Sequence, residues 1–316
     1  MAKVYLICLF LCSLLTPAWA VESSFPLVVV SIKPLHSLVA GVMQGVGAPL
    51  LLVKGGGSPH GYVLRPSEAR ALSRAQLVVW VGEDLESFLQ KPLATLGKRA
   101  QQLKLSDLLQ DDLLVKQQGD RWEGRAHQHS REGEHVDPNS RYQSADLHLW
   151  LDPALAKQIV ILASDRLSEI DPVHSSQYRS NTTALVTKLD QLDQSLKQQL
   201  AAVKDTPYIV FHAAYQYFES AYGLNAVGSI TIDPERTPGA KRIKEIRQKI
   251  NQLGARCVFS EPQFESRLIA TVIEGTGAKT GILDPLGADL PAGPEAYFQL
   301  MTQLVDNLSA GLTPDQ

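Results

Sequence analysis

Four polar residues in the chain stand where their side chains could bind a metal ion. His60 follows a glycine turn, and His148 lies within the segment Asp-Leu-His-Leu-Trp-Leu. His212 and Asp284 each follow an apolar run, Tyr-Ile-Val-Phe and Gly-Ile-Leu. Each of the four comes at the end of a predicted strand, where α/β proteins place their ligands.

Three imidazoles and one carboxylate form a donor set that suits Zn²⁺. Zinc prefers four ligands in a tetrahedron and accepts nitrogen readily, whereas Mn²⁺ and Mg²⁺ favour more oxygen. Because an imidazole must lose its proton to bind a metal, we expect affinity to fall as the pH drops through about 6.5. The intervals between these residues are far longer than those of a zinc finger, so spacing alone does not establish a site.

A second group of histidines lies in a polar stretch without hydrophobic periodicity. His127, His129 and His135 are interspersed with acidic residues at 123–136. Two interpretations stay open for this loop. It binds zinc weakly as a secondary site, or it is a solvated segment whose histidines bind nothing.

The other polar candidates have structural interpretations. His36 is expected to pack or to form a hydrogen bond within the first lobe, and His174 to be exposed at the start of a long helix. Glu261 is expected to support the site or the fold rather than to bind metal itself.

Short β-rich runs alternate with helical stretches, which predicts βα units and largely parallel sheets. The sequence therefore predicts an α/β fold of two Rossmann-like lobes. The predicted strands are 27–32, 49–53, 77–81 and 147–151 in the first half, and 208–211, 226–232, 257–260 and 280–283 in the second.

The longest predicted helix covers residues 174–204. Its leucines recur at intervals of three or four residues from Leu185 to Leu200 and mark one apolar stripe. Such a helix would be roughly 45 Å long, more than a compact lobe requires. We expect a linking helix at 173–204 between an N-terminal lobe at 21–172 and a C-terminal lobe at 205–316.

Residues 1–20 are organised like a signal peptide. Lys3 supplies a positive charge, 4–15 is apolar, and Ala18-Trp19-Ala20 is a small-x-small cleavage site. The apolar run is shorter than the roughly 20 residues that span a bilayer, although an uncleaved anchor is the alternative. We expect cleavage near Ala20, location in the periplasm and no direct membrane insertion.

The composition is that of a globular protein. Of 316 residues, 44% are hydrophobic and 20% charged, and the net charge of −3 gives no indication of nucleic-acid binding. Two of the three cysteines lie in the signal peptide. Cys257 is therefore expected to be a buried core residue without an internal disulfide.

Several motifs resemble those of the metal-binding receptors of ABC importers, the cluster A-I family, and among them the zinc-specific ZnuA type. These motifs follow one another in order from about residue 30 to 290. They are Ser-Ile-Lys-Pro-Leu at 31–35, Leu-Arg-Pro-Ser at 64–67, Leu-Val-Val-Trp-Val-Gly at 77–82, His-Leu-Trp-Leu-Asp-Pro at 148–153, Phe-His-Ala-Ala-Tyr at 211–215, Ser-Glu-Pro-Gln at 260–263 and Leu-Asp-Pro-Leu-Gly at 283–287.

The resemblance implies one Zn²⁺ buried between the lobes, with His60, His148 and His212 as ligands. Manganese receptors of the family carry Glu where this chain has His212, which favours zinc. Close zinc-specific relatives often have Glu just before the first ligand histidine, where this chain has Pro59. The fourth ligand is therefore expected to be Asp284, with water as the alternative.

The function implied by the resemblance is that of a monomeric periplasmic receptor. It would deliver Zn²⁺ to an inner-membrane ABC permease with its ATPase, and it is not expected to be an enzyme. One alternative is a manganese or iron receptor of the same family. The other is an exported zinc hydrolase or lyase, in which an open fourth position activates water. No His-Glu-x-x-His motif supports that last alternative.

Overall fold

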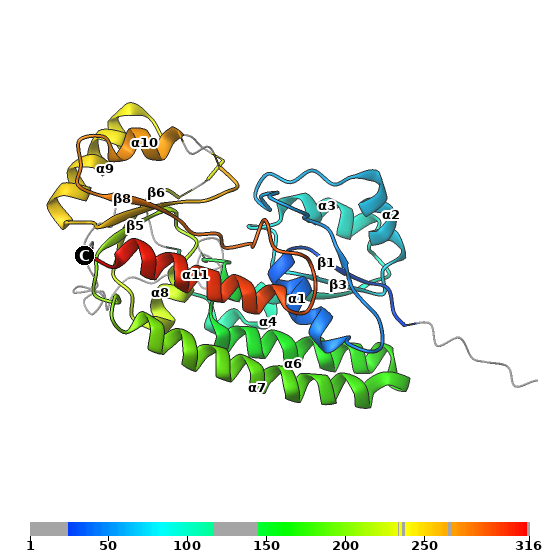
Figure 1. Ribbon diagram of the computed structural model, residues 1–316. Helices are drawn as coiled ribbons and strands as arrows, with labels where there is room; N and C mark the ends of the chain where they lie inside the picture. Colours follow the sequence, from blue (N-terminus) through cyan, green and yellow to red (C-terminus); the bar gives the residue numbers. More distant parts are fainter. Residues whose placement is uncertain (1–24, 117–144, 233, 236–237, 265–266, 315–316) are drawn as a thin grey trace, which may run out of the picture.

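The computed structural model describes residues 25–116, 145–232, 234–235, 238–264 and 267–314. The predicted signal peptide and the loop with His127, His129 and His135 lie outside the described residues. The described chain forms two four-stranded sheets, and all pairs of neighbouring strands within them are parallel (Figure 1). This arrangement confirms the predicted two-lobed α/β fold.

The first sheet has the strand order β2-β1-β3-β4. Helices cover both of its faces, which explains why β1 and β3 are apolar along their whole length. Alternate residues of β1 and β3 belong to a cluster with α2 and α3, and the others pack with α1. The bounds are β1 (Val28–Val30), α1 (Lys33–Val42), β2 (Leu50–Leu51), α2 (Pro66–Arg74), β3 (Leu77–Trp80), α3 (Ser87–Thr95), β4 (Gln101–Lys104) and α4 (Leu105–Leu108).

The second sheet has the order β6-β5-β7-β8. Helices α9 and α10 pack on one face through Ile246, Ile250, Ile269 and Val272. Helices α8 and α11 lie on the side that faces the rest of the molecule (Figure 1). The bounds are β5 (Tyr208–His212), α8 (Gln216–Tyr222), β6 (Ala226–Thr231), α9 (Ala240–Leu253), β7 (Cys257–Ser260), α10 (Arg267–Ile273), β8 (Lys279–Ile282) and α11 (Ala296–Leu312).

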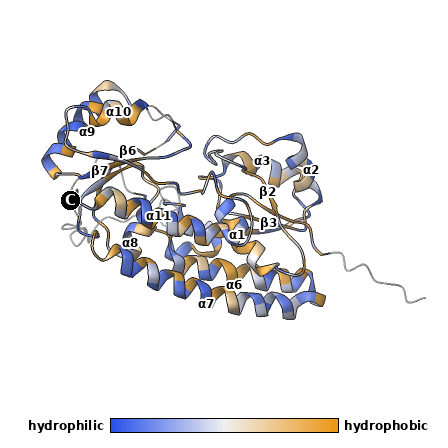
Figure 2. Ribbon diagram, viewed as in Figure 1, coloured by the Kyte–Doolittle hydropathy of each residue, from blue (hydrophilic) through white to orange (hydrophobic). Residues whose placement is uncertain are grey.

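Two long helices, α6 (Pro153–Ile170) and α7 (Ser175–Leu200), run side by side beneath both sheets (Figure 1). The predicted leucine stripe of α7 is buried at 185, 189, 196 and 200. Apolar and hydrophilic residues alternate along both helices (Figure 2). A single apolar cluster includes strands of both sheets and the leucines of α7, so the two lobes share one continuous core.

The prediction of a strand at 147–151 is wrong. Leu149–Leu151 forms a 3-10 helix, whose side chains are completely buried. Periodicity alone does not distinguish a short buried strand from a buried helical turn. Conversely, β4 was not predicted, because only Leu103 among its four residues is buried.

No described helix combines the length and apolar character needed to cross a membrane. Cys257 is a buried free thiol, as predicted.

Candidate metal centre

Three histidines from distant parts of the sequence meet between the lobes. His60 lies on the loop between β2 and α2, His148 precedes the 3-10 helix, and His212 is the last residue of β5. One possible ligand atom from each ring lies within 4.8 Å of the other two. The pocket around them is lined from the first lobe by Ser58, Pro59 and Trp150, and from the second by Glu261, Gln263, Phe264, Pro285 and Leu286.

The spacing of the rings fits a tetrahedral metal ion. Nε2 of His148 lies 3.3 Å from Nε2 of His212. Two nitrogens bound to one zinc at 2.0–2.1 Å would lie roughly 3.4 Å apart. The ring of His60 completes a triangle, with its centroid 5.6 Å from that of His148 and 5.7 Å from that of His212.

Two buried carboxylates fix the tautomers of this pair. Nδ1 of His148 lies 2.8 Å from Oδ1 of Asp146, and Nδ1 of His212 lies 2.6 Å from Oε1 of Glu261. Since an ionised carboxylate only accepts hydrogen bonds, each Nδ1 carries the proton and each Nε2 presents a lone pair. Two lone pairs at this separation repel each other, and a cation between them removes the repulsion.

Glu261 therefore supports His212, in agreement with the structural interpretation of this residue. Asp146 was not among the predicted site residues. Its position two residues before a candidate ligand is the one signal in the sequence that could have indicated it.

Burial favours the neutral form of His60 and of His148, and metal binding requires that form. Burial and the neighbouring histidines His148 and His212 lower the pKa of His60 to about 2. Burial also lowers the pKa of His148, although Asp146 opposes the shift.

The loop that carries His60 is held by a hydrogen-bond network. The hydroxyl of Tyr62 donates to Oε1 of Glu68 at 2.8 Å and lies 3.1 Å from the carbonyl oxygen of Leu52. Oε2 of Glu68 accepts from the backbone N–H of Arg65 at 2.8 Å. Glu68 is buried, so this network fixes the return of the loop into α2.

The structure does not bring Asp284 to the three imidazoles. Oδ1 of Asp284 accepts from Nε2 of Gln263 at 2.7 Å and from the N–H of Leu286 at 3.0 Å, while Oδ2 accepts from the N–H of Ala288. The carboxylate thus stabilises the turn that follows β8.

This turn is attached to the first lobe. Nζ of Lys33 donates to the carbonyl oxygens of Gly287, Ala288 and Leu290. Nε1 of Trp150 donates to the carbonyl oxygen of Pro285 at 2.8 Å.

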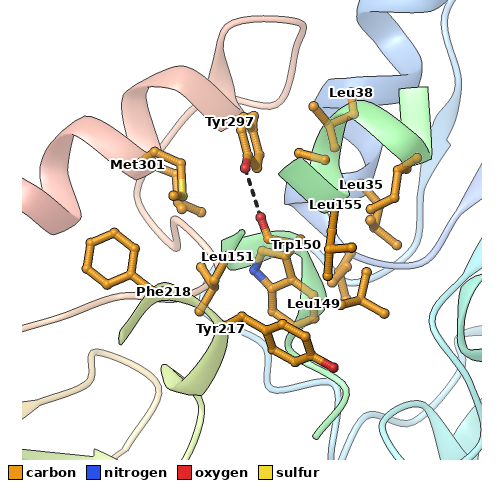
Figure 3. Close-up of a cluster of buried hydrophobic side chains, with 14 of the residues drawn as sticks. Leu35, Leu38, Leu149, Trp150, Leu151, Leu155, Tyr217, Phe218, Tyr297 and Met301 are labelled. Carbon is orange, nitrogen blue, oxygen red and sulfur yellow. Dashed lines mark hydrogen bonds between the residues drawn. The ribbon is translucent and has the colours of Figure 1, made fainter. Parts of the chain in front are cut away.

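Trp150 itself is fixed in the core. The hydroxyl of Tyr297 donates to its carbonyl oxygen at 2.8 Å, and aromatic and aliphatic side chains surround it (Figure 3). Because Trp150 lies two residues after His148, this packing restrains the backbone of a candidate ligand.

The two other described histidines have structural roles. Nε2 of His36 lies 3.0 Å from the carbonyl oxygen of Pro49, and the residue is buried, as expected. Nδ1 of His174 lies 2.7 Å from Oδ2 of Asp171. The expectation that His174 is exposed is wrong, since the residue is half-buried.

Two parallel-sheet lobes with three converging imidazoles between them define a metal-binding receptor of the two-lobed class. The family model described as zinc-uptake complex component A, periplasmic (ZnuA), matches residues 28–311. The chain belongs to the ZnuA family of zinc-binding receptors in zinc uptake systems.

Comparison with individual proteins agrees. The chain is 46% identical to the high-affinity zinc uptake system protein ZnuA of Brucella abortus over 302 residues, which cover 89% of this chain and 90% of the relative. It is 37% identical to the Yersinia pestis protein of the same name, over 88% of each chain. A crystal structure of ZnuA superposes with a TM-score of 0.75 at 23% identity, covering 92% of this chain and all of that one, which shows the shared fold.

Proposed function

We propose that the protein captures one Zn²⁺ at His60, His148 and His212 in the periplasm and delivers it to an inner-membrane ABC permease with its ATPase. The observation that carries the proposal is the 3.3 Å separation between Nε2 of His148 and Nε2 of His212. Asp146 and Glu261 set the tautomers of these two rings, so both Nε2 atoms present lone pairs. The names of the relatives, high-affinity zinc uptake proteins, support zinc as the cargo.

The remaining parts of the proposal concern the chain as a whole. The signal peptide is removed near Ala20 and the mature protein acts as a monomer. Its lobes occupy 21–172 and 205–316, with the linking helix at 173–204. The histidine loop at 123–136 contributes weak secondary zinc binding.

A receptor role is favoured over a zinc hydrolase by the burial of the site. His148 and His212 are only 6% and 3% exposed. Trp150, Phe264 and Pro285 also line the pocket. An ion held there is shielded from a large substrate. Three nitrogen donors likewise favour zinc over manganese.

Growth on scarce zinc tests delivery. The full chain is expressed in a bacterium that lacks its own periplasmic zinc receptor, in medium depleted of zinc with a chelator. The wild-type chain is expected to restore growth, and the variant with His60, His148 and His212 all changed to Ala is not. His174→Ala, outside the site, is the matched control and is expected to restore growth. Growth supported equally by the triple variant would contradict the proposal.

A further inference from the structure

We propose that Gln263 determines the fourth ligand of the bound zinc. Its side-chain amide holds Asp284 away from the metal, and its side-chain carbonyl oxygen accepts a hydrogen bond from a water molecule that completes the tetrahedron. This inference rests on the proposed function, because it concerns the same site.

The hydrogen-bond network fixes the orientation of the Gln263 amide. Gln263 lies three residues after β7 and lines the pocket with the three histidines. Its Nε2 donates to Oδ1 of Asp284 at 2.7 Å. Since a carboxylate offers no proton, the NH₂ group must face Asp284, and the carbonyl oxygen occupies the other branch of the amide.

That carbonyl oxygen is an unsatisfied acceptor. Oε1 of Gln263 is buried, and it has no hydrogen-bond partner among the described residues. Leaving a buried acceptor unpaired costs about 1–3 kcal/mol. A donor within the pocket would remove this cost. The Nε2 atoms of His148 and His212 cannot supply it, because the proton of each ring lies on Nδ1.

A zinc-bound water molecule is the donor that the site can supply. Three histidine ligands leave one tetrahedral position, which water fills in sites of this type. Zinc makes a bound water more acidic and therefore a stronger hydrogen-bond donor. One water thus completes the coordination and satisfies Gln263 at the same time.

Asp284 is held in its present place by three donors. They are Nε2 of Gln263 and the N–H groups of Leu286 and Ala288. Moving the carboxylate onto the metal would break these bonds and disrupt the turn that Lys33 attaches to the first lobe. By keeping this carboxylate out of the coordination sphere, Gln263 also keeps the donor set poor in oxygen, which disfavours manganese.

The test uses the mature chain loaded with Co²⁺, whose visible spectrum reports its ligands, and sodium azide as the probe. Azide displaces a coordinated water but not a carboxylate or amide of the protein. The wild-type spectrum is expected to shift on addition of azide. Asp284→Ala and the milder Asp284→Asn are expected to leave both the spectrum and the azide shift in place.

Gln263→Leu removes the acceptor and is expected to weaken zinc binding about tenfold, as loss of a group that orients a ligand does. Gln177→Leu, on the exposed side of α7, is the matched control and should leave affinity unchanged. A wild-type spectrum that does not respond to azide but changes in the Asp284 variants would overturn the inference in favour of a carboxylate ligand. If the wild-type spectrum did not respond to azide and the spectrum changed in Gln263→Leu, the Gln263 amide itself would be the ligand. That result would also overturn the inference.

Failure of the proposed function looks different. If the wild-type chain bound neither Zn²⁺ nor Co²⁺, or if His212→Ala bound them equally well, the three-histidine site itself would be wrong. Tight binding that depends on the histidines, combined with azide insensitivity, would contradict only the role of Gln263.

Discussion

Oε1 of Glu261 lies 2.6 Å from Nδ1 of His212, and this contact joins the residue after β7 to the last residue of β5. Both side chains are almost completely buried. The carboxylate therefore orients the imidazole before any metal arrives, which reduces the cost of ordering the ligand on binding.

Glu261→Gln is expected to weaken zinc binding by about 10–100-fold. The amide can donate to Nδ1 and so favour the tautomer with a proton on Nε2, where the metal must bind. Competition with a chromophoric chelator would measure the loss. Asp146→Asn should act in the same way through His148, while Glu83→Gln, in a half-buried ion pair with Lys104 outside the site, serves as the control. Affinities of both buried variants equal to that of the control would contradict this account.

Lys33→Met is expected to lower the free energy of unfolding by about 2–4 kcal/mol, because it leaves the carbonyl oxygens of Gly287, Ala288 and Leu290 without their charged donor. Urea denaturation of the metal-free protein would measure the change. Lys188→Met removes an exposed ion pair with Glu295 and should cost less than about 1 kcal/mol. If the free energy of unfolding fell equally in both variants, the hydrogen bonds from Lys33 to this turn would contribute little to stability.

Acid is expected to destabilise the metal-free protein. Imidazoles of the unfolded chain take up protons below pH 6.5, whereas burial lowers the pKa of His60 to about 2 and also lowers those of His148 and His36. Below pH 6.5 the unfolded state thus binds more protons, and the free energy of unfolding falls with pH by up to about 1.4 kcal/mol per unit for each such histidine.

Denaturation of the metal-free chain at pH 7 and pH 5 would measure this slope, and His60→Asn should reduce it. A slope that His60→Asn leaves unchanged would show that His60 is protonated equally in both states. Because the pKa values of His60 and His148 are lowered, protons are expected to compete with the metal at these two residues only below pH 6.5, the value of about 6.5 being that of free imidazole.

The fold was largely predictable from the sequence because its signals are local. Apolar runs at β3, β5 and β7 are bounded by turn residues, and the leucine stripe of α7 follows helical periodicity. The fully buried segment at 149–151 was assigned to a strand because every residue there is apolar, which removes the periodicity that separates strand from helix.

The candidate site was predictable in part. The three histidines were identified by the motifs around them, and the structure brings their rings together. Asp284 was predicted as a ligand from its place after a strand, but its oxygens accept hydrogen bonds from Gln263 and the following turn. Such contacts depend on packing between distant segments, and sequence spacing does not encode them.

The central claim is a zinc site that depends on His212, and calorimetry of the mature chain from Val21 tests it most directly. Zinc is titrated alone and against manganese, with wild type, His212→Ala and the control His36→Ala, which lies outside the site. The account predicts one tight zinc site that manganese does not displace, strongly weakened by His212→Ala and retained by His36→Ala. Preference for manganese, or unchanged zinc binding in His212→Ala, would contradict it.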